Sequence, residues 1–399
     1  MFGSFNLDKT YQYLLITLAF LLPLTVFGAN LIIVIITTFW LISGDYKSKL
    51  NEIFKNRLLV ASILFFLLHL VGLIWTDDLE WGLHIVHKMW YFLLLFPILC
   101  SVTKREHIKY YISAFLFAIF LTEVASYLIW FELVEPFKNA SVRNPTPFMS
   151  HISYNPILAF ACYLVLHEIF FNKKLKKSEL FAYSFFAISM SFNMFITAGR
   201  AGQVMFFAML AILIFQYFYN QKIKAIVVIL IVVGGVFLTA YESNTIFKPR
   251  INAAVKAIQY YDINKATSVG HRITFAVNSL EIIKENLIIG VGTGDFPSEY
   301  KRVNLINTPN LPSPDNPHNM YILVLMQLGI IGLISFLSIF YYQIKYSFLS
   351  KNNFIRDVGI TLPLLFLLIM WSDSYLLGHY TSLMYIFFSS FLYKDFEKS

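Results

Sequence analysis

Long apolar runs separated by short polar stretches make up most of the chain. Most of these runs are about 17 to 25 residues long, which is the length that a helix needs to cross a bilayer. We therefore predict an all-α polytopic membrane protein with about twelve transmembrane helices and one large, partly helical loop. The predicted spans are residues 11–27, 30–43, 58–75, 85–100, 109–131, 151–171, 179–197, 201–219, 223–241, 318–343, 358–373 and 377–393.

The first apolar stretch, residues 11–43, is too long for one ordinary span. It contains Pro23 and then Gly28-Ala29-Asn30, which favour a turn, so we divide it into two tightly connected helices. Lys9 precedes this stretch, and no small-residue cleavage pattern follows it. We therefore expect an uncleaved entry into the membrane rather than a removed signal peptide.

One long polar segment, residues 242–317, interrupts the series of apolar runs. It contains two stretches with helical periodicity, at about residues 251–261 and 271–286. After them comes a run rich in proline and asparagine that ends at Pro317 and is typical of irregular backbone. We expect this segment to fold over the membrane surface.

The long loop divides the chain into three parts. We predict nine transmembrane helices in residues 1–241, a loop over the site in residues 242–317, and three transmembrane helices in residues 318–399. We find no internal repeat in the sequence.

Charge sets the expected orientation of these parts. The chain is 58% hydrophobic and only 14% charged, yet its formal net charge is +8. Most basic residues lie in short loops at alternate ends of the spans, where they set topology and meet anionic lipid rather than nucleic acid. This pattern predicts that both termini are cytoplasmic and that the long loop faces outward.

Cysteine and acidic residues give no sign of a disulfide framework or a metal site. Cys100 and Cys162 both lie within apolar runs. The acidic residues Asp77, Asp78 and Asp295 lack the spacing of a dedicated ion site. We predict neither a metal nor another cofactor.

The stretch from Asn316 to Gly332 joins a polar loop to an apolar helix. With Asn316 as the N-cap and Pro317 in the first helical position, His318 and Asn319 are expected in the opening turn. The N-terminal end of a helix favours a neutral imidazole, which suits a proton acceptor. The alternative is that His318 is an interfacial residue that ends a span.

Three arginines are predicted on the outward face. Arg143 precedes the sixth span, Arg200 lies in the short turn between the seventh and eighth, and Arg272 begins a loop helix. A guanidinium group binds phosphate through paired N–H donors, so these residues are candidate diphosphate ligands. The alternative is that they extend toward lipid head groups.

Two further features are predicted beside these cations. His151 lies near the outer end of the sixth span and either lines the same cleft or packs between helices. Gly290-Val291-Gly292-Thr293-Gly294 either forms an anion-binding turn around Gly292 or a simple tight turn. The run lacks the Gly-Lys-Ser/Thr of a nucleotide-binding loop.

An acidic residue within the membrane raises the possibility of transport. Glu123 lies inside the fifth predicted span, where an ionisable residue is costly and is by default a functional candidate. A transporter needs a polar path through the bilayer, and Glu123 with scattered histidines gives little support for one.

The loop and the helix that follows it resemble the bacterial O-antigen ligases and the related Wzy-type polymerases. His318-Asn319, nine further residues and then Gly329-Ile330-Ile331-Gly332 are similar to the ligase signature. Arg272 with the later glycine run resembles the loop pattern of this family. Thr197-Ala198-Gly199-Arg200 resembles its Ser-Arg turn, with Gly199 in place of the usual serine.

The resemblance implies a metal-independent glycosyltransferase of the bacterial cytoplasmic membrane. Such an enzyme transfers a glycan from undecaprenyl diphosphate to a lipid A core on the periplasmic side. By this resemblance His318, Arg272 and Arg200 are expected to be catalytic, and Arg143, Asn319, His151 and Gly292 to bind substrate.

Other activities share the donor or the membrane setting. A polysaccharide polymerase lengthens the glycan, and a protein O-oligosaccharyltransferase transfers it to protein. The His-Asn and Gly-x-x-Gly signature favours a ligase over a polymerase. The third alternative is a transporter for lipid-linked glycans.

Overall fold

The computed structural model describes residues 6–138, 140–243 and 247–394. Within these residues the chain is helical and forms no strand, apart from an isolated bridge between Ser141 and Asn144. The helices are α1 (Leu7–Leu21), α2 (Val26–Ile42), α3 (Tyr46–Lys55), α4 (Arg57–Val71), α5 (Leu79–Trp90), α6 (Phe96–Val102), α7 (Ile108–Trp130), α8 (His151–Phe171), α9 (Lys177–Ile196), α10 (Arg200–Tyr217), α11 (Lys222–Ser243), α12 (Phe247–Gln259), α13 (Ser268–Glu285), α14 (Phe296–Asn307), α15 (Met320–Leu349), α16 (Asn353–Ile369) and α17 (His379–Leu392).

The apolar runs predicted as spans all fall on helices. Eight helical segments in the described residues are long and apolar enough to cross a membrane, and a ninth is added if the bent pair α2 and α3 counts as one span. The other predicted spans form α1, α16 and α17, which have 15, 17 and 14 residues. The prediction of an all-α polytopic membrane protein is therefore confirmed.

The long loop is helical, as predicted, but contains one more helix than expected. The two predicted loop helices correspond to α12 and α13. The run after Asp295, expected to be irregular, begins with the 12-residue helix α14. Pro297 lies in its first turn, where a missing N–H costs no helical hydrogen bond. Phe296 and Tyr300 are buried and fix this helix against its neighbours.

The described residues cluster into two compact units. The first comprises the described parts of residues 1–11, 33–105 and 253–399, and the second comprises those of 12–32 and 106–252. These units differ from the three sequential parts predicted above, which follow membrane topology rather than packing.

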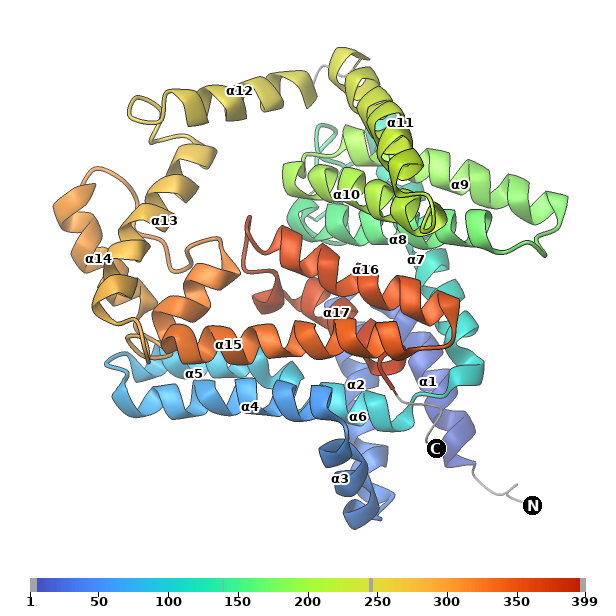
Figure 1. The fold of residues 1–399 in the computed structure, drawn as a ribbon, viewed down its shortest axis with the longest axis horizontal. Coiled ribbons are helices and arrows are strands. Elements are labelled where there is room, and N and C mark those ends of the chain that lie inside the picture. The colour runs from blue at the N-terminus through green and yellow to red at the C-terminus, as the bar shows by residue number, and fades with distance from the viewer. Residues whose placement is uncertain (1–5, 139, 244–246, 395–399) are drawn as a thin grey trace. The chain divides into compact units, whose positions relative to one another are not determined.

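In the first unit, α15 packs along α4 and beside α16, while α13 and α14 pack near its N-terminal end (Figure 1). Phe65 of α4 and Phe336 of α15 lie with ring centroids 5.1 Å apart. Gln343 of α15 accepts a 2.9 Å hydrogen bond from Tyr385 of α17 and donates one of 3.0 Å to Ser389. Membrane lipid is as apolar as the phenylalanine side chains, so the hydrophobic effect does not drive these helices together. Close packing and hydrogen bonds such as those of Gln343 hold them in place.

In the second unit, α8 is the central helix, with α9 and α10 packed against it. Residues 154–165 of α8 are buried throughout. A Cβ at Gly202 of α10 would lie 2.2 Å from the Cβ of Asn155, so only glycine permits this close approach. The approach brings the N-terminal ends of α8 and α10 together.

Candidate active site

The N-terminal end of α15 differs from its prediction. The helix begins at Met320, and Asn319 rather than Asn316 is the N-cap. The Oδ1 atom of Asn319 accepts hydrogen bonds from the N–H groups of Tyr321 and Ile322, at 3.0 and 3.1 Å. The prediction that His318 lies in the opening turn was therefore wrong, because the helix is capped by Asn319, three residues after the predicted cap.

Asn316 instead organises the loop before the helix. Its Oδ1 atom accepts hydrogen bonds from the N–H of His318 at 2.8 Å and from the hydroxyl of Ser374 at 2.9 Å. His318 has a φ of 52°, a left-handed conformation that costs a non-glycine residue about 1–2 kcal/mol. The side chain of Asn316 thus holds the backbone of His318 in this conformation and links it to the turn that contains Ser374.

Asp373 orients the ring of His318. The Nδ1 atom of His318 lies 3.1 Å from Oδ1 of Asp373, which also accepts a 2.8 Å hydrogen bond from the N–H of Ser374. The side chain of Asp373 is 17% exposed and that of His318 is 40% exposed. No hydrogen bond in the described part of the chain engages Nε2 of His318. Asp373 therefore fixes the Nδ1 atom of His318, while a substrate can reach the Nε2 atom.

Sequence reasoning did not identify Asp373. It lies in the turn after α16, which ends at Ile369. In the sequence it is the last residue of the predicted span 358–373, whose end the span count puts on the same face as His318. Asn319 strengthens the link, since its Nδ2 donates a 3.3 Å hydrogen bond to the carbonyl of Trp371. An acidic residue at the end of a span, on the side predicted for His318, was the available signal.

Arg272 lies near this pair. It belongs to the first turns of α13, which is capped by Thr267 through a 3.1 Å hydrogen bond from the N–H of Gly270. Phe275, one turn further along, stacks near His318 with ring centroids 6.2 Å apart. Among the described residues no hydrogen bond or ion pair engages the half-buried guanidinium of Arg272, so its donors are open to a ligand.

Tyr375 reports the electrostatics of the same region. The pKa of Tyr375 is raised to about 12, mainly by burial; the charge of Asp373 adds to this rise, while a hydrogen bond with Ser372 and the charge of Arg272 oppose it. Both charged side chains therefore act on one neighbouring phenol. The first unit thus brings together a histidine, an acidic partner and a cation at the end of α15.

The glycine run is a tight turn whose backbone donors are already used. Gly292 donates to the carbonyl of Gln327 at 3.1 Å, Thr293 to that of Gly72 at 3.3 Å, and Gly294 to the hydroxyl of Thr76 at 3.0 Å. Gly292 has a φ of 119°, which favours glycine. A substrate-binding role for Gly292 stays a prediction, but its N–H points into the protein.

The acidic residues around this turn have structural roles. Asp295 accepts hydrogen bonds from the hydroxyl of Thr76 at 2.8 Å and from the N–H groups of Asp77 and Asp78 at 3.0 and 2.9 Å. Within the described residues, no three histidine, cysteine or acidic side chains are grouped so that they could hold a metal ion.

A second cluster lies in the other unit, where Arg200 is the first residue of α10. Asn155 of α8 fixes the preceding turn, because its Nδ2 donates to the carbonyl of Gly199 at 3.2 Å and its Oδ1 accepts from the hydroxyl of Thr197 at 2.9 Å. A Cβ at Gly199 would lie 2.7 Å from the carbonyl oxygen of His151. Glycine at this position therefore lets the turn lie against the start of α8.

Asn144 links His151 to the same turn. Its Nδ2 lies 3.0 Å from Nδ1 of His151, and its Oδ1 accepts a 3.1 Å hydrogen bond from the N–H of Ala198. Arg250, which sequence reasoning did not identify, donates a 2.6 Å hydrogen bond to the carbonyl of Ala198. In the sequence, Arg250 is distinguished only as a basic residue near the start of the long loop. Arg143 is exposed beside Asn144.

Glu123 belongs to a buried polar network in this unit. The hydroxyl of Ser189 donates to its Oε1, while its Oε2 is buried without a hydrogen-bond partner. Tyr154 of α8 donates to Asn193 at 2.9 Å, and Asn193 donates to Ser126 at 3.0 Å. These contacts join α7, α8 and α9 and give Glu123 a role in helix association.

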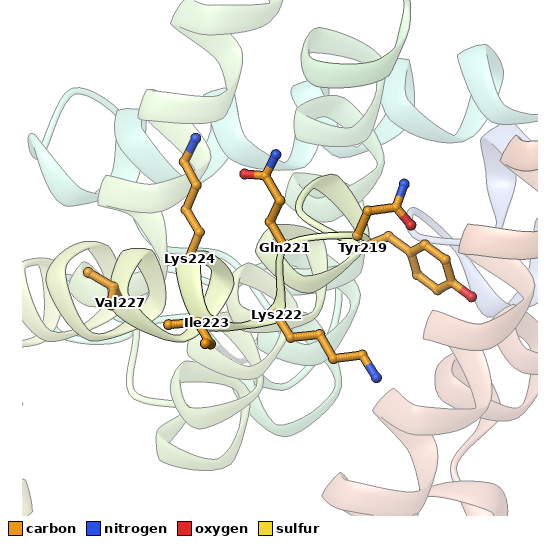
Figure 2. Close-up of a pocket in the computed structure, with 7 residues that line it drawn as sticks. Tyr219, Gln221, Lys222, Ile223, Lys224 and Val227 are labelled. Atoms are coloured by element: carbon orange, nitrogen blue, oxygen red, sulfur yellow. The ribbon is translucent and has the colours of Figure 1, made fainter.

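A hollow at the opposite end of α10 from Arg200 does not have the chemistry of the site. Figure 2 shows the residues that line it, with the side chains of Lys222 and Lys224 pointing to opposite sides. The ammonium group of Lys224 lies 4.9 Å from the ring centre of Phe218. The lining contains no histidine or carboxylate, so it offers neither a base nor an acid.

Comparison with known sequences matches one part of the chain. Residues 185–337 match the sequence family described as O-Antigen ligase. The matched range contains Arg200, Arg272 and His318. No curated protein matches the chain.

Proposed function

We propose that this chain, whose residues 185–337 match the O-antigen ligase family, transfers a glycan from undecaprenyl diphosphate to a lipid A core. The transfer takes place on the periplasmic face of the bacterial cytoplasmic membrane, with both termini in the cytoplasm. The main support for this proposal is the pair formed by His318 and Asp373 at the N-terminal end of α15, where Nδ1 of the histidine lies 3.1 Å from Oδ1 of the aspartate.

The chemistry requires a base and a stabiliser of negative charge. The hydroxyl oxygen of the acceptor attacks the anomeric carbon of the donor, and the bond from that carbon to the diphosphate breaks. Nε2 of His318 accepts the proton of the hydroxyl, and Asp373 stabilises the resulting imidazolium. The lipid diphosphate leaves with its negative charge, so no metal is required if arginines stabilise it.

Arg272 is the cation that we assign to the leaving diphosphate in the first unit. Its half-buried guanidinium lies one turn before Phe275, which stacks near His318. Paired N–H donors match the phosphate oxygens, and burial strengthens the interaction relative to water. Asn319 holds the start of α15 against the turn after α16 through its hydrogen bond to the carbonyl of Trp371. We also assign it a contact with the substrate beside His318.

Arg200 and His151 are proposed to bind the donor through the second cluster. Asn155 and Asn144 hold the turn from Thr197 to Arg200, so the backbone that carries the guanidinium of Arg200 is fixed. Arg143 supplies a further exposed cation for the same anionic substrate. Membrane lipid surrounds the spans and accommodates the polyprenyl chain.

The proposal is tested with purified protein in lipid vesicles, using a glycan on undecaprenyl diphosphate and lipid A core as acceptor. We expect glycan-modified core from the wild type and none above background from His318→Ala. Transfer at the wild-type rate by His318→Ala would refute the assignment. Longer donor glycan with unmodified core would identify a polymerase, and glycan on a protein acceptor would identify an oligosaccharyltransferase.

A further inference from the structure

Helix α15 is interrupted at Gly329, which has φ 62° and ψ −160°. In an unbroken helix the N–H groups of residues 330 and 331 would donate to the carbonyl groups of Met326 and Gln327. The break leaves two donors and two acceptors of the backbone without these partners. Inside a membrane each unpaired group would cost several kcal/mol.

A segment of the long loop, residues 287–292, supplies all four missing partners. Val291 donates to the carbonyl of Met326 at 2.8 Å, and Gly292 to that of Gln327 at 3.1 Å. In return, Ile330 donates to the carbonyl of Leu287 at 2.8 Å, and Ile331 to that of Ile288 at 3.4 Å. The loop segment therefore completes the hydrogen bonding of the broken helix.

Two glycines make this insertion sterically possible. A Cβ at Gly329 would lie 2.2 Å from the carbonyl oxygen of Ile288, and a Cβ at Gly290 would lie 2.4 Å from the carbonyl carbon of Gln327. Both glycines have positive φ. The two backbones are in direct contact, with no side chain between them.

The same contacts place the loop segment at membrane depth. The N–H of Arg57, at the start of α4, donates to the hydroxyl of Tyr346, so the basic end of α4 lies beside the C-terminal part of α15. At 1.5 Å per residue, Gly329 lies about 26 Å from the level of Tyr346. A hydrocarbon core is about 30 Å thick, so Gly329 lies below the far surface.

Helix α4 gives a second measure of depth. The hydroxyl of Thr293 donates to the carbonyl of His69 at 2.8 Å, and His69 lies about 18 Å from Arg57 along the helix. The chain then reaches Asp295, which binds the connection between α4 and α5 through the N–H groups of Asp77 and Asp78. The loop therefore enters from the His318 side and returns to that side.

The side chains of this segment are apolar and uncovered by protein. Leu287, Ile288 and Ile289 are all exposed, and Ile288 is 65% exposed. They adjoin the exposed side chains of Ile330 and Ile331 on α15, whose long apolar helix is a candidate membrane span. The exposed surface of the loop segment is thus continuous with the lipid-facing surface of a span.

We propose that residues 287–292 form a re-entrant segment inside the leaflet on the His318 side, with Leu287, Ile288 and Ile289 in contact with phospholipid acyl chains. Irregular backbone is stable at this depth because α15 and α4 satisfy its polar groups. The long loop is therefore anchored in the membrane at its centre and does not lie wholly above it. This inference does not depend on glycosyl transfer.

Site-directed spin labelling in reconstituted phospholipid vesicles tests the proposal. A nitroxide is attached at Ile288→Cys, and its collision rates with oxygen, which is enriched in lipid, and with a water-soluble nickel chelate are compared. Ile334→Cys on α15 is the lipid reference, since Ile334 is 64% exposed on the span. Ile263→Cys is the water reference, because Ile263 is 85% exposed within the polar loop before α13.

We expect the label at position 288 to behave like that at 334, with at least a several-fold higher ratio of oxygen to nickel collisions than at 263. A ratio equal to that at 263 would overturn the proposal. Cys100 and Cys162 are buried, so wild-type protein treated in the same way measures the background. Thermal unfolding of each cysteine variant in detergent confirms that the compared proteins are folded.

Discussion

His318 and Asp373 lie 55 positions apart in the sequence, yet Nδ1 of the histidine is 3.1 Å from Oδ1 of the aspartate. The contact joins the loop before α15 to the turn after α16. Ser374 closes the arrangement, because its N–H donates to Asp373 and its hydroxyl donates to Asn316. The loop before α15 and the turn after α16 therefore fix the imidazole ring of His318 together.

The first prediction concerns this pair. We expect His318→Ala to lower kcat by about 10²- to 10⁴-fold, the range for loss of a general base. Asp373→Asn removes a charge-assisted hydrogen bond worth about 1.5–3 kcal/mol, so kcat is expected to fall about 10- to 100-fold with little change in KM. Steady-state glycan transfer measures both. Asp315→Asn, at an exposed acidic residue of the same loop, is the control.

The second prediction concerns the arginines. Lysine keeps the charge of Arg272 or Arg200 but cannot form the paired hydrogen bonds of a guanidinium. We expect each Arg→Lys variant to lower kcat/KM by about 10- to 100-fold, which corresponds to one or two lost charge-assisted hydrogen bonds. Lys284→Gln on the exposed face of α13 is the matched control for Arg272→Lys. Equal rates for variant and control would exclude diphosphate binding by that arginine.

The third prediction concerns Arg250, which holds the turn before Arg200 by donating to Ala198. Removing a charged donor from this carbonyl loosens the turn and misplaces the guanidinium of Arg200. We expect Arg250→Gln to raise the KM for the lipid-linked donor several-fold while kcat changes less. Lys256→Gln, at an exposed residue of α12, should leave both constants unchanged. A fall in kcat at constant KM would contradict a positioning role.

The sequence predicted the helices of the fold because hydropathy and length constrain a membrane span strongly. It also predicted His318 and Arg272 as site residues, because their residue types and neighbours carry the signal. It named Asn316 as the cap of α15 where the structure has Asn319, because asparagine caps helices at either position and only the side-chain hydrogen bonds decide.

Other features depend on contacts between distant segments. Asp373 is an ordinary acidic residue of a short turn until the fold brings it beside His318. Helix α14 was missed because Pro297 and the asparagines near it resemble a loop, although Arg302 pairs with Glu299 and Glu285 at 2.9 Å and stabilises the helix. The break at Gly329 is visible in the sequence only as the first glycine of a Gly-x-x-Gly motif, without its backbone angles.

The fourth prediction concerns Gly329. Its backbone conformation is nearly exclusive to glycine, and forcing alanine into it costs about 1–3 kcal/mol before any steric clash. The clash with Ile288 adds to this cost, so Gly329→Ala is expected to lower the midpoint of thermal unfolding sharply or to prevent folding. Gly234→Ala is the control, because nothing lies within 4 Å of a Cβ there and alanine favours helix α11. Equal midpoints for the two variants would show that the break at Gly329 is not required.

The fifth prediction concerns Asp295, whose carboxylate accepts hydrogen bonds from Thr76, Asp77 and Asp78. An asparagine side chain at this position would offer only one acceptor oxygen, and an unpaired buried polar group costs about 1–3 kcal/mol. We therefore expect Asp295→Asn to lower the free energy of unfolding by about that amount, and Asp77→Asn, at an exposed side chain, to lower it by less than about 0.5 kcal/mol. Unfolding in detergent measures both variants.

The same measurement distinguishes this structural role from ion binding. If the three aspartates held a cation, millimolar Mg²⁺ or Ca²⁺ would raise the unfolding midpoint of the wild type, since a ligand stabilises the state that binds it. A carboxylate whose oxygens already accept three hydrogen bonds has little capacity left for a cation. We therefore expect the midpoint to stay constant with added ion, and an increase that Asp295→Asn abolishes would favour a metal site instead.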